Sequence, residues 1–355
     1  MDISGGEQFD VIVVGAGNAA TCAALSARES GARVLMLEIA PEEACGGNSC
    51  FTGGAFRVVY HGFDDLARLI PDIGDHELGN VEVGTYTEEE YFDDMGRMTE
   101  YRCDPDLTET LIRSSFDTAV WMREQGVRFQ LGLGRQAFQV DGKFKFWGGL
   151  ACHIWGGGKE LMKALHGRAA REGIWVLFET PAIGLLQGDG GVEGVRVRHR
   201  GRIRELRGKT VVLACGGFEA NAEMRARYLG PNWDLAKVRG SRFNTGQGLK
   251  MALDLGAAVA GHWSGAHAVA WDLNAPPFGK FGRSRRVAGC RIHSASIIDF
   301  IAQSAIYRRE VPPPQGGRAR TPPSTGARRC RDPGSGGAHR IRGHRRIRGC
   351  QSLSP

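Results

Sequence analysis

The 355-residue chain has a formal net charge of +7, but the excess lies in residues 283–355, which contain 16 Arg, no Lys and 3 acidic residues. Residues 1–282 carry a net charge of −6, so the basic average gives no reason to expect a nucleic-acid partner. Nine cysteines, with no C-x-x-C pair and no secretory leader before them, predict reduced thiols in a cytoplasmic protein. No apolar run approaches the ~18 residues of a membrane span.

The first predicted elements alternate strand, helix and strand, which is typical of a parallel sheet. DVIVVG (10–15) is a short apolar run and predicts a buried strand. Residues 18–31 place small residues on one helical face and end at Gly31, and residues 32–38 predict the next strand.

Further elements follow a Gly-rich loop. The middle of the chain predicts two helices, 87–101 and 104–126, with Asp104 as the N-cap of the second. It then predicts paired strands around a DG turn within 129–147, a helix over 156–173 and a strand over 174–180. After these come an antiparallel ribbon over 182–208, a buried strand that breaks at two glycines within 209–221, and helix 245–259. Beyond about residue 283 only residues 296–307 show helical periodicity.

The segment VIVVGAGNAATCAALSARESGARVLMLE carries a dinucleotide-binding pattern. Gly15, Gly17 and Ala20 give G-x-G-x-x-A between the first strand and its helix. Gly15 permits the tight turn, Gly17 lets a pyrophosphate approach the positive end of the helix, and Ala20 allows close packing of helix on strand. Glu38 ends the second strand, where its carboxylate can accept hydrogen bonds from ribose hydroxyls and would repel a 2′-phosphate.

Two later glycine-rich segments favour FAD over NAD as the dinucleotide. GGNSCFTGGA (46–55) follows the second strand, where an NAD domain would usually continue into a helix. ACGGFEAN (214–221) ends a late strand in the same way. Together they offer backbone amides where a long flavin dinucleotide needs them.

These segments, with TGQGLKMALDLGA, resemble in their order the fumarate reductase/succinate dehydrogenase flavoproteins. GGNSCFTGGAFR and WGGGKELMKALHGRAAREGI are closest in detail to FAD-dependent tricarballylate dehydrogenases. The resemblance covers about residues 8–282. It implies an α/β fold, with a Rossmann-like FAD-binding domain that combines a parallel sheet and an antiparallel β-ribbon, and with a capping domain that is largely missing.

The resemblance also implies which residues contact the cofactor. Gly15, Gly17, Ala20 and Glu38 would hold the ADP half of FAD. The pyrophosphate and isoalloxazine would be lined by Asn48, Ser49, Thr52, Gly53 and Gly54. Ala182 would lie near the adenine, and Gly216 and Gly217 would close the site. Asn48 stands where succinate dehydrogenases carry the histidine bonded to the flavin, so FAD is expected to be non-covalent. Gln247 replaces the aspartate that is usual in the TGQG segment.

Other candidate sites are weaker. His267 lies where fumarate reductases place a histidine for a substrate carboxylate, although a polar loop histidine is the alternative. Arg57 could meet a substrate carboxylate, but an ordinary surface arginine is the favoured interpretation. Cys103, Cys152 and His153 have no second spaced pair of ligands, so no metal site is expected.

The implied reaction is oxidation of tricarballylate to cis-aconitate, with hydride transfer to FAD. The implied partners are a small polycarboxylate substrate and an electron-acceptor protein, which can be associated with a membrane; nucleic acid is not expected. Alternatives stay open: another member of the superfamily (a fumarate reductase, aspartate oxidase or ketosteroid dehydrogenase), or a non-catalytic FAD-binding fragment.

The predicted domains are an FAD-binding domain over 8–265, the start of a capping or substrate domain over 266–282, and an Arg/Pro/Gly-rich tail over 283–355. The absence of Lys from the tail is typical of GC-rich coding sequence read out of frame. We therefore expect the tail to be aberrant and disordered, and the chain to be incomplete and inactive as an enzyme.

Overall fold

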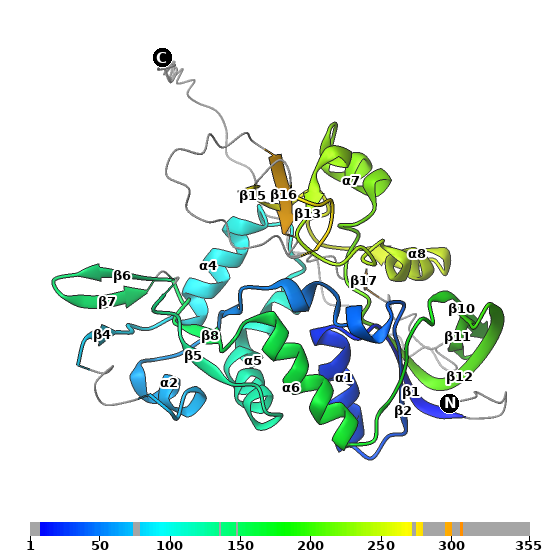
Figure 1. The fold of residues 1–355 in the computed structure, drawn as a ribbon, viewed down its shortest axis with the longest axis horizontal. Helices are drawn as coiled ribbons and strands as arrows, with labels where there is room; N and C mark the ends of the chain where they lie inside the picture. Colours follow the sequence, from blue (N-terminus) through cyan, green and yellow to red (C-terminus); the bar gives the residue numbers. More distant parts are fainter. Residues whose placement is uncertain are drawn as a thin grey trace, which may run out of the picture. The chain divides into compact units, whose positions relative to one another are not determined.

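The computed structural model describes residues 8–73, 79–134, 136–146, 148–271 and 275–279, together with the backbone of two short strands at 295–299 and 306–307. The chain divides into two units, Met1–Arg309 and Glu310–Pro355, and all described residues belong to the first (Figure 1). Predictions about the rest of residues 283–355 lie outside the described residues.

The largest sheet of the described residues has six strands (Figure 1). Its strands are β1 (Phe9–Val14), β2 (Val34–Leu37), β9 (Trp175–Leu177), β10 (Ala182–Gly188), β11 (Gly191–His199) and β12 (Arg202–Leu213), in the order β10-β11-β12-β1-β2-β9. The pairs β12–β1, β1–β2 and β2–β9 are parallel, and β10, β11 and β12 form an antiparallel ribbon. The predicted fold class is confirmed.

One strand joins the two parts of this sheet. The sequence predicted a ribbon that ends at residue 208 and a separate buried strand after it, whereas β12 runs unbroken from Arg202 to Leu213. Its first half pairs antiparallel with β11, and its second half pairs parallel with β1, from Gly208 opposite Phe9 to Leu213 opposite Val14. Gly208 permits the crossing, because a Cβ there would lie 2.9 Å from the side chain of Ile12.

The central strands are buried on both faces, as parallel strands usually are. Val13 and Met36 point into one apolar cluster, which includes small residues of α1 (Asn18–Glu29) and leucines of α6 (Gly158–Arg171). Ile12 and Leu35, one residue earlier in each strand, point into the opposite cluster with residues of the ribbon and of α8 (Gln247–Asp254). This period-two alternation fixes the register of the sheet and places α1 beside α6 on one face (Figure 1).

The middle of the chain contains α4 (Glu88–Met98), α5 (Pro105–Glu124) and small sheets. Asp104 caps α5 by accepting from the amide of Leu107 at 3.0 Å, as predicted. The DG turn is confirmed: Asp141 and Gly142 have positive φ and join β6 (Ala137–Val140) to β7 (Lys143–Phe146). β5 (Phe129–Leu131) also lies within the strands predicted over 129–147. The remaining elements, which were not predicted, are α2 (Phe63–Leu69), β3 (Ala55–Phe56), β4 (Val81–Glu82) and β8 (Cys152–Ile154).

The last described elements are α7 (Ala222–Leu229), β13 (Lys237–Val238), β14 (Ala258–Val259), β15 (His267–Trp271), β16 (Ala295–Asp299) and β17 (Ile306–Tyr307). The helical interpretation is wrong for residues 296–299 and 306–307, because β16 pairs with β13 and β15, and β17 pairs with β14; residues 300–305 lie outside the described residues. Within the described ranges, no helix has the length and apolarity needed to cross a bilayer.

Candidate cofactor site

The turn between β1 and α1 presents an open helix end. Gly17 is the N-cap residue and supplies no side-chain hydrogen bond, so the first turn of α1 is not capped locally. The amide of Asn18 donates instead to the hydroxyl of Ser49, at 3.0 Å, from a segment 31 residues away. Such an end, with its amides and its positive dipole, is suited to a pyrophosphate.

The two glycines of this turn have different surroundings. Gly15 has φ of +118°, and a Cβ there would lie 2.4 Å from the carbonyl oxygen of Ala214. Gly17 has no such constraint, since its nearest neighbours would be Ser49 Oγ at 3.4 Å and the Gly46 carbonyl oxygen at 3.6 Å. The polypeptide therefore requires Gly15 for its own packing, while the space beside Gly17 remains free for a ligand.

Glu38 lies at the end of β2 and is buried. Its carboxylate accepts from the amide of Ala40 at 2.8 Å, and its backbone bonds to Leu177 and Thr180. Burial raises the pKa of Glu38, although hydrogen bonds from backbone amides oppose the shift. The carboxylate thus stands at the carboxyl edge of the parallel strands, where an adenosine ribose is bound in this type of sheet.

The glycine-rich loop folds over the start of α6. Ser49 belongs to a 3₁₀ turn, η2 (Gly47–Phe51), and Thr52 follows it. The Thr52 hydroxyl accepts from the amide of Gly54 at 3.2 Å, and its carbonyl accepts from the amide of Gly158 at 3.0 Å. The backbones approach so closely that a Cβ on Gly158 would lie 2.1 Å from the Ser49 carbonyl oxygen, and one on Gly54 would lie 3.0 Å from Cα of Gly157. Gly53 lies between Thr52 and Gly54 in the same loop.

The segment after β12 completes the cradle. Gly216 has φ of +73°, and a Cβ there would lie 2.8 Å from Asn244 Nδ2. The carbonyl of Gly217 accepts from the amide of Gly246 at 3.0 Å. Asn48 reaches the same region from η2, where its Oδ1 accepts from the amide of Ser241 at 2.8 Å. The structure therefore brings together the three glycine-rich segments that the sequence marked separately.

One residue of this cradle was not predicted from the sequence. Glu219 follows the two glycines and is only 2% exposed. Burial raises its pKa to about 7, against hydrogen bonds from its own backbone and from the side chains of Asn244 and Asn48. Its Oε2 has no hydrogen-bond partner within the described structure. The sequence signal was an acidic residue two positions after the pair of glycines that follows a buried strand.

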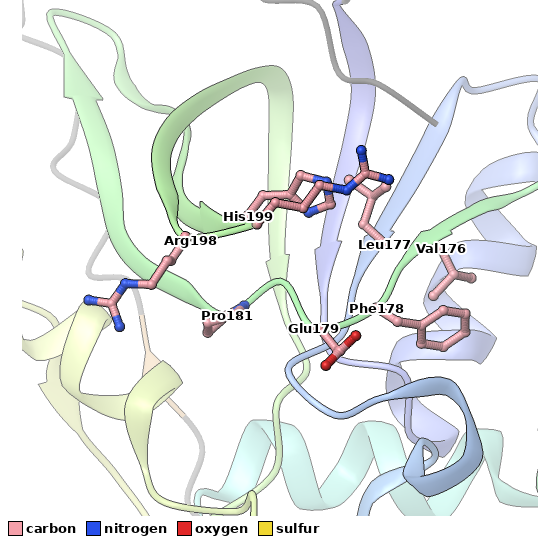
Figure 2. Close-up of a pocket in the computed structure, with 9 residues that line it drawn as sticks. Val176, Leu177, Phe178, Glu179, Pro181, Arg198 and His199 are labelled. Carbon is pink, nitrogen blue, oxygen red and sulfur yellow. The ribbon is translucent and has the colours of Figure 1, made fainter.

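Ala182 begins β10 and is buried two residues after Thr180, which bonds to the carbonyl of Glu38 at 2.8 Å. The structure thus places Ala182 near the Glu38 end of the site. A hollow of about 510 Å³ lies beside it, lined by the end of β9 and by the turn between β11 and β12 (Figure 2). None of the predicted cofactor residues lines this hollow, so it adjoins the cradle and is not the cradle itself.

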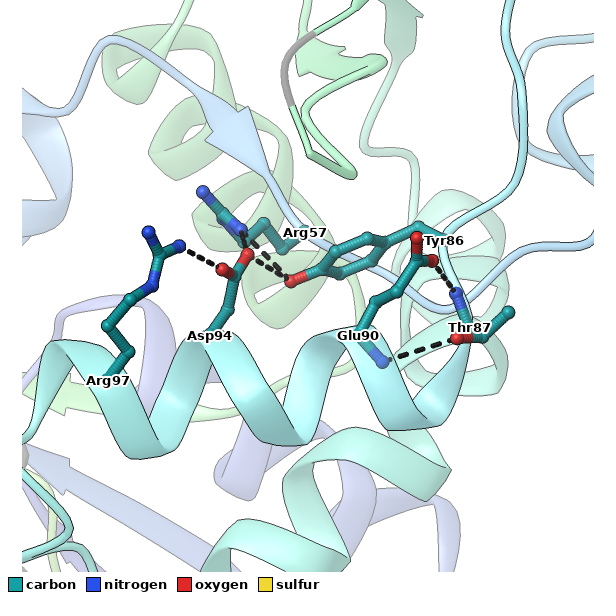
Figure 3. Close-up of polar contacts among 6 residues, drawn as sticks. All are labelled: Arg57, Tyr86, Thr87, Glu90, Asp94 and Arg97. Carbon is teal, nitrogen blue, oxygen red and sulfur yellow. Dashed lines mark hydrogen bonds and ion pairs between the residues drawn. The ribbon is translucent and has the colours of Figure 1, made fainter.

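Arg57 has an ion-pair partner of its own. Its guanidinium contacts the carboxylate of Asp94 and donates to the hydroxyl of Tyr86 at 3.0 Å, and that hydroxyl donates to Asp94 at 2.8 Å (Figure 3). Burial alone would raise the pKa of Asp94, but hydrogen bonds from Tyr86, Arg97 and Arg57 lower it. This network ties the strand after the glycine-rich loop to α4 and leaves Arg57 committed within the fold.

The remaining candidates are His267 and the thiols. The backbone of His267 begins β15, but its side chain lies outside the described residues. Two thiols that were not predicted as site residues, Cys45 and Cys215, lie in or beside the glycine-rich segments; burial raises their pKa values to about 11, so both are protonated at neutral pH. In the part of the chain that is described, no cluster of His, Cys, Asp or Glu could hold a metal ion.

The residues present fit FAD. The cradle offers the uncapped start of α1, free space beside Gly17, a buried carboxylate for ribose hydroxyls, and an unpaired buried oxygen on Glu219. Gly15, Gly17, Ala20 and Glu38 would hold the ADP half. Residues of the glycine-rich segments would hold the remainder.

Comparison with known proteins agrees with this assignment. The family model described as FAD binding domain matches residues 10–272. A vinyl phenol reductase from Lactiplantibacillus plantarum is 30% identical over 268 residues, which cover 74% of this chain and 48% of that protein. An NADH:fumarate oxidoreductase from Klebsiella pneumoniae is 25% identical over 254 residues, covering 71% of this chain and 25% of that protein. The chain thus spans about half or less of the length of these relatives.

Solved structures give the same result. The open conformation of a flavocytochrome c3 fumarate reductase matches with a TM-score of 0.56 and 26% identity, over 72% of this chain and 42% of that one. A 3-ketosteroid-Δ4-(5α)-dehydrogenase from Rhodococcus jostii RHA1 shares the fold, with a TM-score of 0.58 and 22% identity over 75% of this chain and 57% of that one. Residues 10–272, about three quarters of the chain, therefore belong to the FAD-binding domain family of the fumarate reductase/succinate dehydrogenase flavoprotein superfamily.

Proposed function

We propose that this chain is the FAD-binding part of a dehydrogenase that acts on a CH–CH bond, with tricarballylate as the preferred substrate. Relatives named as fumarate, urocanate and vinyl phenol reductases support the reaction class, because each name denotes a substrate with a reducible carbon–carbon double bond. The observation that carries the proposal is the cradle itself, in which three glycine-rich segments and Glu38 meet. Support for tricarballylate comes from the resemblance of residues 46–57 and 155–174 alone.

In this proposal, different residues bind the cofactor and the substrate. FAD, when bound, supplies the hydride acceptor. The start of α1 holds the pyrophosphate, Glu38 orients the ribose, and the loop at 46–55 excludes water from one side. Because Arg57 is paired with Asp94, we place the cationic partners of the substrate carboxylates elsewhere than at this residue. His267 is the proposed substrate-carboxylate contact.

The substrate class is tested by titrating the FAD-loaded chain with tricarballylate, succinate and 4-androstene-3,17-dione while following the flavin absorption bands. We expect a saturable change with tricarballylate, a weaker one with succinate and none with the steroid. A parallel assay with an artificial dye separates binding from turnover. A response to the steroid without any response to the polycarboxylates would contradict the substrate class.

We further propose that FAD is held without a covalent bond, because the side chain of Asn48 is an amide that bonds to Ser241. Acid precipitation of the loaded protein is expected to leave a yellow supernatant, and flavin retained in the pellet would contradict this. An electron-acceptor protein, which can be membrane-associated, and a cytoplasmic location complete the proposal; no nucleic acid takes part.

A further inference from the structure

Glu219 is held firmly in place by its backbone. Its carbonyl accepts from Nη1 of Arg225 at 2.5 Å, and the next amide, of Ala220, donates to the carbonyl of Asn244 at 2.8 Å. Arg225 is itself buried and donates to the carbonyls of Trp233 and Asp234. The backbone that carries the buried Glu219 side chain is therefore held in place by these contacts.

Among the described residues, no opposite charge lowers the pKa of the Glu219 carboxyl group. Its side-chain partners, Asn48 and Asn244, are neutral amides, and they come from two other segments of the cradle. The described cation nearest in the chain, Arg225, is engaged with main-chain carbonyls. A buried carboxyl with one unpaired oxygen destabilises a fold, so its presence requires either a compensating partner or a function.

The surrounding glycines direct the two amides toward this carboxyl. A Cβ on Gly240 would lie 2.4 Å from Asn48 Oδ1, and a Cβ on Gly216 would lie 2.8 Å from Asn244 Nδ2. Larger residues at these positions would displace both amides. The unpaired oxygen of Glu219 thus belongs to a built polar group, whose members come from the loop at 46–55, the end of β12 and the segment before α8.

We propose that Glu219 is a cofactor-binding residue, whose unpaired oxygen makes a hydrogen bond with FAD when the cradle is filled. The inference rests on FAD binding by this family and goes beyond it, because it assigns FAD as the hydrogen-bond partner of Glu219 Oε2. With its pKa raised to about 7, the carboxyl is substantially protonated at and below neutrality and can donate to a flavin carbonyl or ring nitrogen.

The test compares FAD affinity of the full chain with that of three variants at pH 6.5, by quenching of flavin fluorescence. Glu219→Ala removes the hydrogen bond, and we expect the dissociation constant to rise about 10-fold or more. Glu219→Gln keeps a donor of similar shape and is expected to stay within about 3-fold of the wild type. The matched control is Glu223→Ala, four residues on, where the side chain is exposed and only weakly paired with Arg227.

The possible outcomes separate this inference from the family assignment. An Ala variant that binds FAD as the wild type does, while the wild type binds well, overturns the role of Glu219 alone. A wild type that binds no FAD overturns both. If Glu219 had a purely structural role, Glu219→Ala would lower the unfolding temperature of the FAD-free protein and leave its FAD affinity unchanged. Because the buried acid destabilises the fold, we expect instead that the FAD-free Ala variant unfolds at a higher temperature and binds FAD more weakly. A shift of the bound flavin spectrum in the Ala variant provides a second supporting readout.

Discussion

Gly15 and Gly17 stand two residues apart in one turn, and their surroundings predict opposite effects of mutation. Gly17→Val adds side-chain atoms where the nearest groups are Ser49 Oγ and the Gly46 carbonyl, in the space expected for the pyrophosphate. We expect the FAD dissociation constant to rise by about 100-fold or more, since the phosphates lose their approach to the amides of α1. The FAD-free protein should retain its unfolding temperature to within about 2 °C, because its own packing has room for the first added atom.

Gly15→Ala is the matched control. Its Cβ would collide with the carbonyl of Ala214, and its φ of +118° is unfavourable for any side chain. This variant should be destabilised by about 2 kcal/mol or more even without FAD. Thermal unfolding of both FAD-free variants checks the contrast. If Gly17→Val unfolded as early as Gly15→Ala, the assignment of Gly17 to the ligand would be wrong.

Glu219 predicts a pH dependence that can be measured without cofactor. Its pKa is about 7 in the fold against an ordinary value of 4.5, so the folded state binds more protons than the unfolded state between these values. The free energy of unfolding should therefore fall by a total of about 3–4 kcal/mol as pH rises through this window, and it should level off above it. Glu219→Gln has no carboxyl group at this position and lacks this loss. Its free energy of unfolding should match that of the wild type near pH 4.5 and exceed it at pH 8.

Urea denaturation of both proteins at several pH values measures this difference. Glu38, whose pKa burial also raises, is present in both and cancels in the comparison. Parallel curves for the two proteins across the window would show that the Glu219 carboxyl titrates normally.

At the scale of elements, the contact between α6 and η2 depends on a single glycine. Gly158→Ala would place a Cβ 2.1 Å from the Ser49 carbonyl oxygen, so the helix and the loop must separate. We expect a loss of about 2 kcal/mol or more in the free energy of unfolding, together with weaker FAD binding.

Gly167→Ala provides a comparison on the same helix. A Cβ there would meet only the end of the flexible Arg171 side chain, at 3.6 Å. Alanine is the better helix former, so this variant should gain about 0.5–1 kcal/mol without a change in FAD affinity. Equal destabilisation by the two substitutions would contradict the proposed close contact and point to a general sensitivity of α6.

The elements show which features can be predicted from sequence. The β1–α1–β2 unit, the Asp104 cap of α5 and the hairpin at Asp141 follow local rules, and all were predicted. The continuity of β12 was missed because a strand that changes partners at Gly208 has no local signal for the change. Residues 295–299 and 306–307 form strands because their pairing partners β13, β14 and β15 outweigh the helical periodicity.

The same distinction applies to the site. The glycines and Glu38 could be assigned because a cofactor imposes a fixed spacing on them. The contacts of Glu219 with Asn48 and Asn244 could not be predicted, because these residues lie far apart in the chain. No motif with a fixed spacing links Asn48 to the other two residues. The pairing of Arg57 with Asp94 depends in the same way on how α4 packs.

At the scale of the whole described unit, the two halves of the site differ in how they are assembled. The ADP half is built within one β–α–β stretch, from Gly15 to Glu38. The flavin half requires the loop at 46–55, the start of α6, the end of β12 and the segment at 241–246 to meet. An unfolded chain has neither half, so any ligand of the folded site must raise the unfolding temperature.

This difference predicts an order of stabilisation by FAD, ADP and FMN. FAD at 100 times its dissociation constant should stabilise the fold by about 2.7 kcal/mol, which corresponds to an increase in the unfolding temperature of about 5 °C. At the same concentration, ADP should give a smaller but clear increase, because it engages Gly17 and Glu38. FMN, which lacks the adenosine, should have almost no effect. Circular dichroism melts measure all three without interference from flavin emission. An FMN effect as large as that of FAD would mean that the β1–α1–β2 unit does not anchor the dinucleotide.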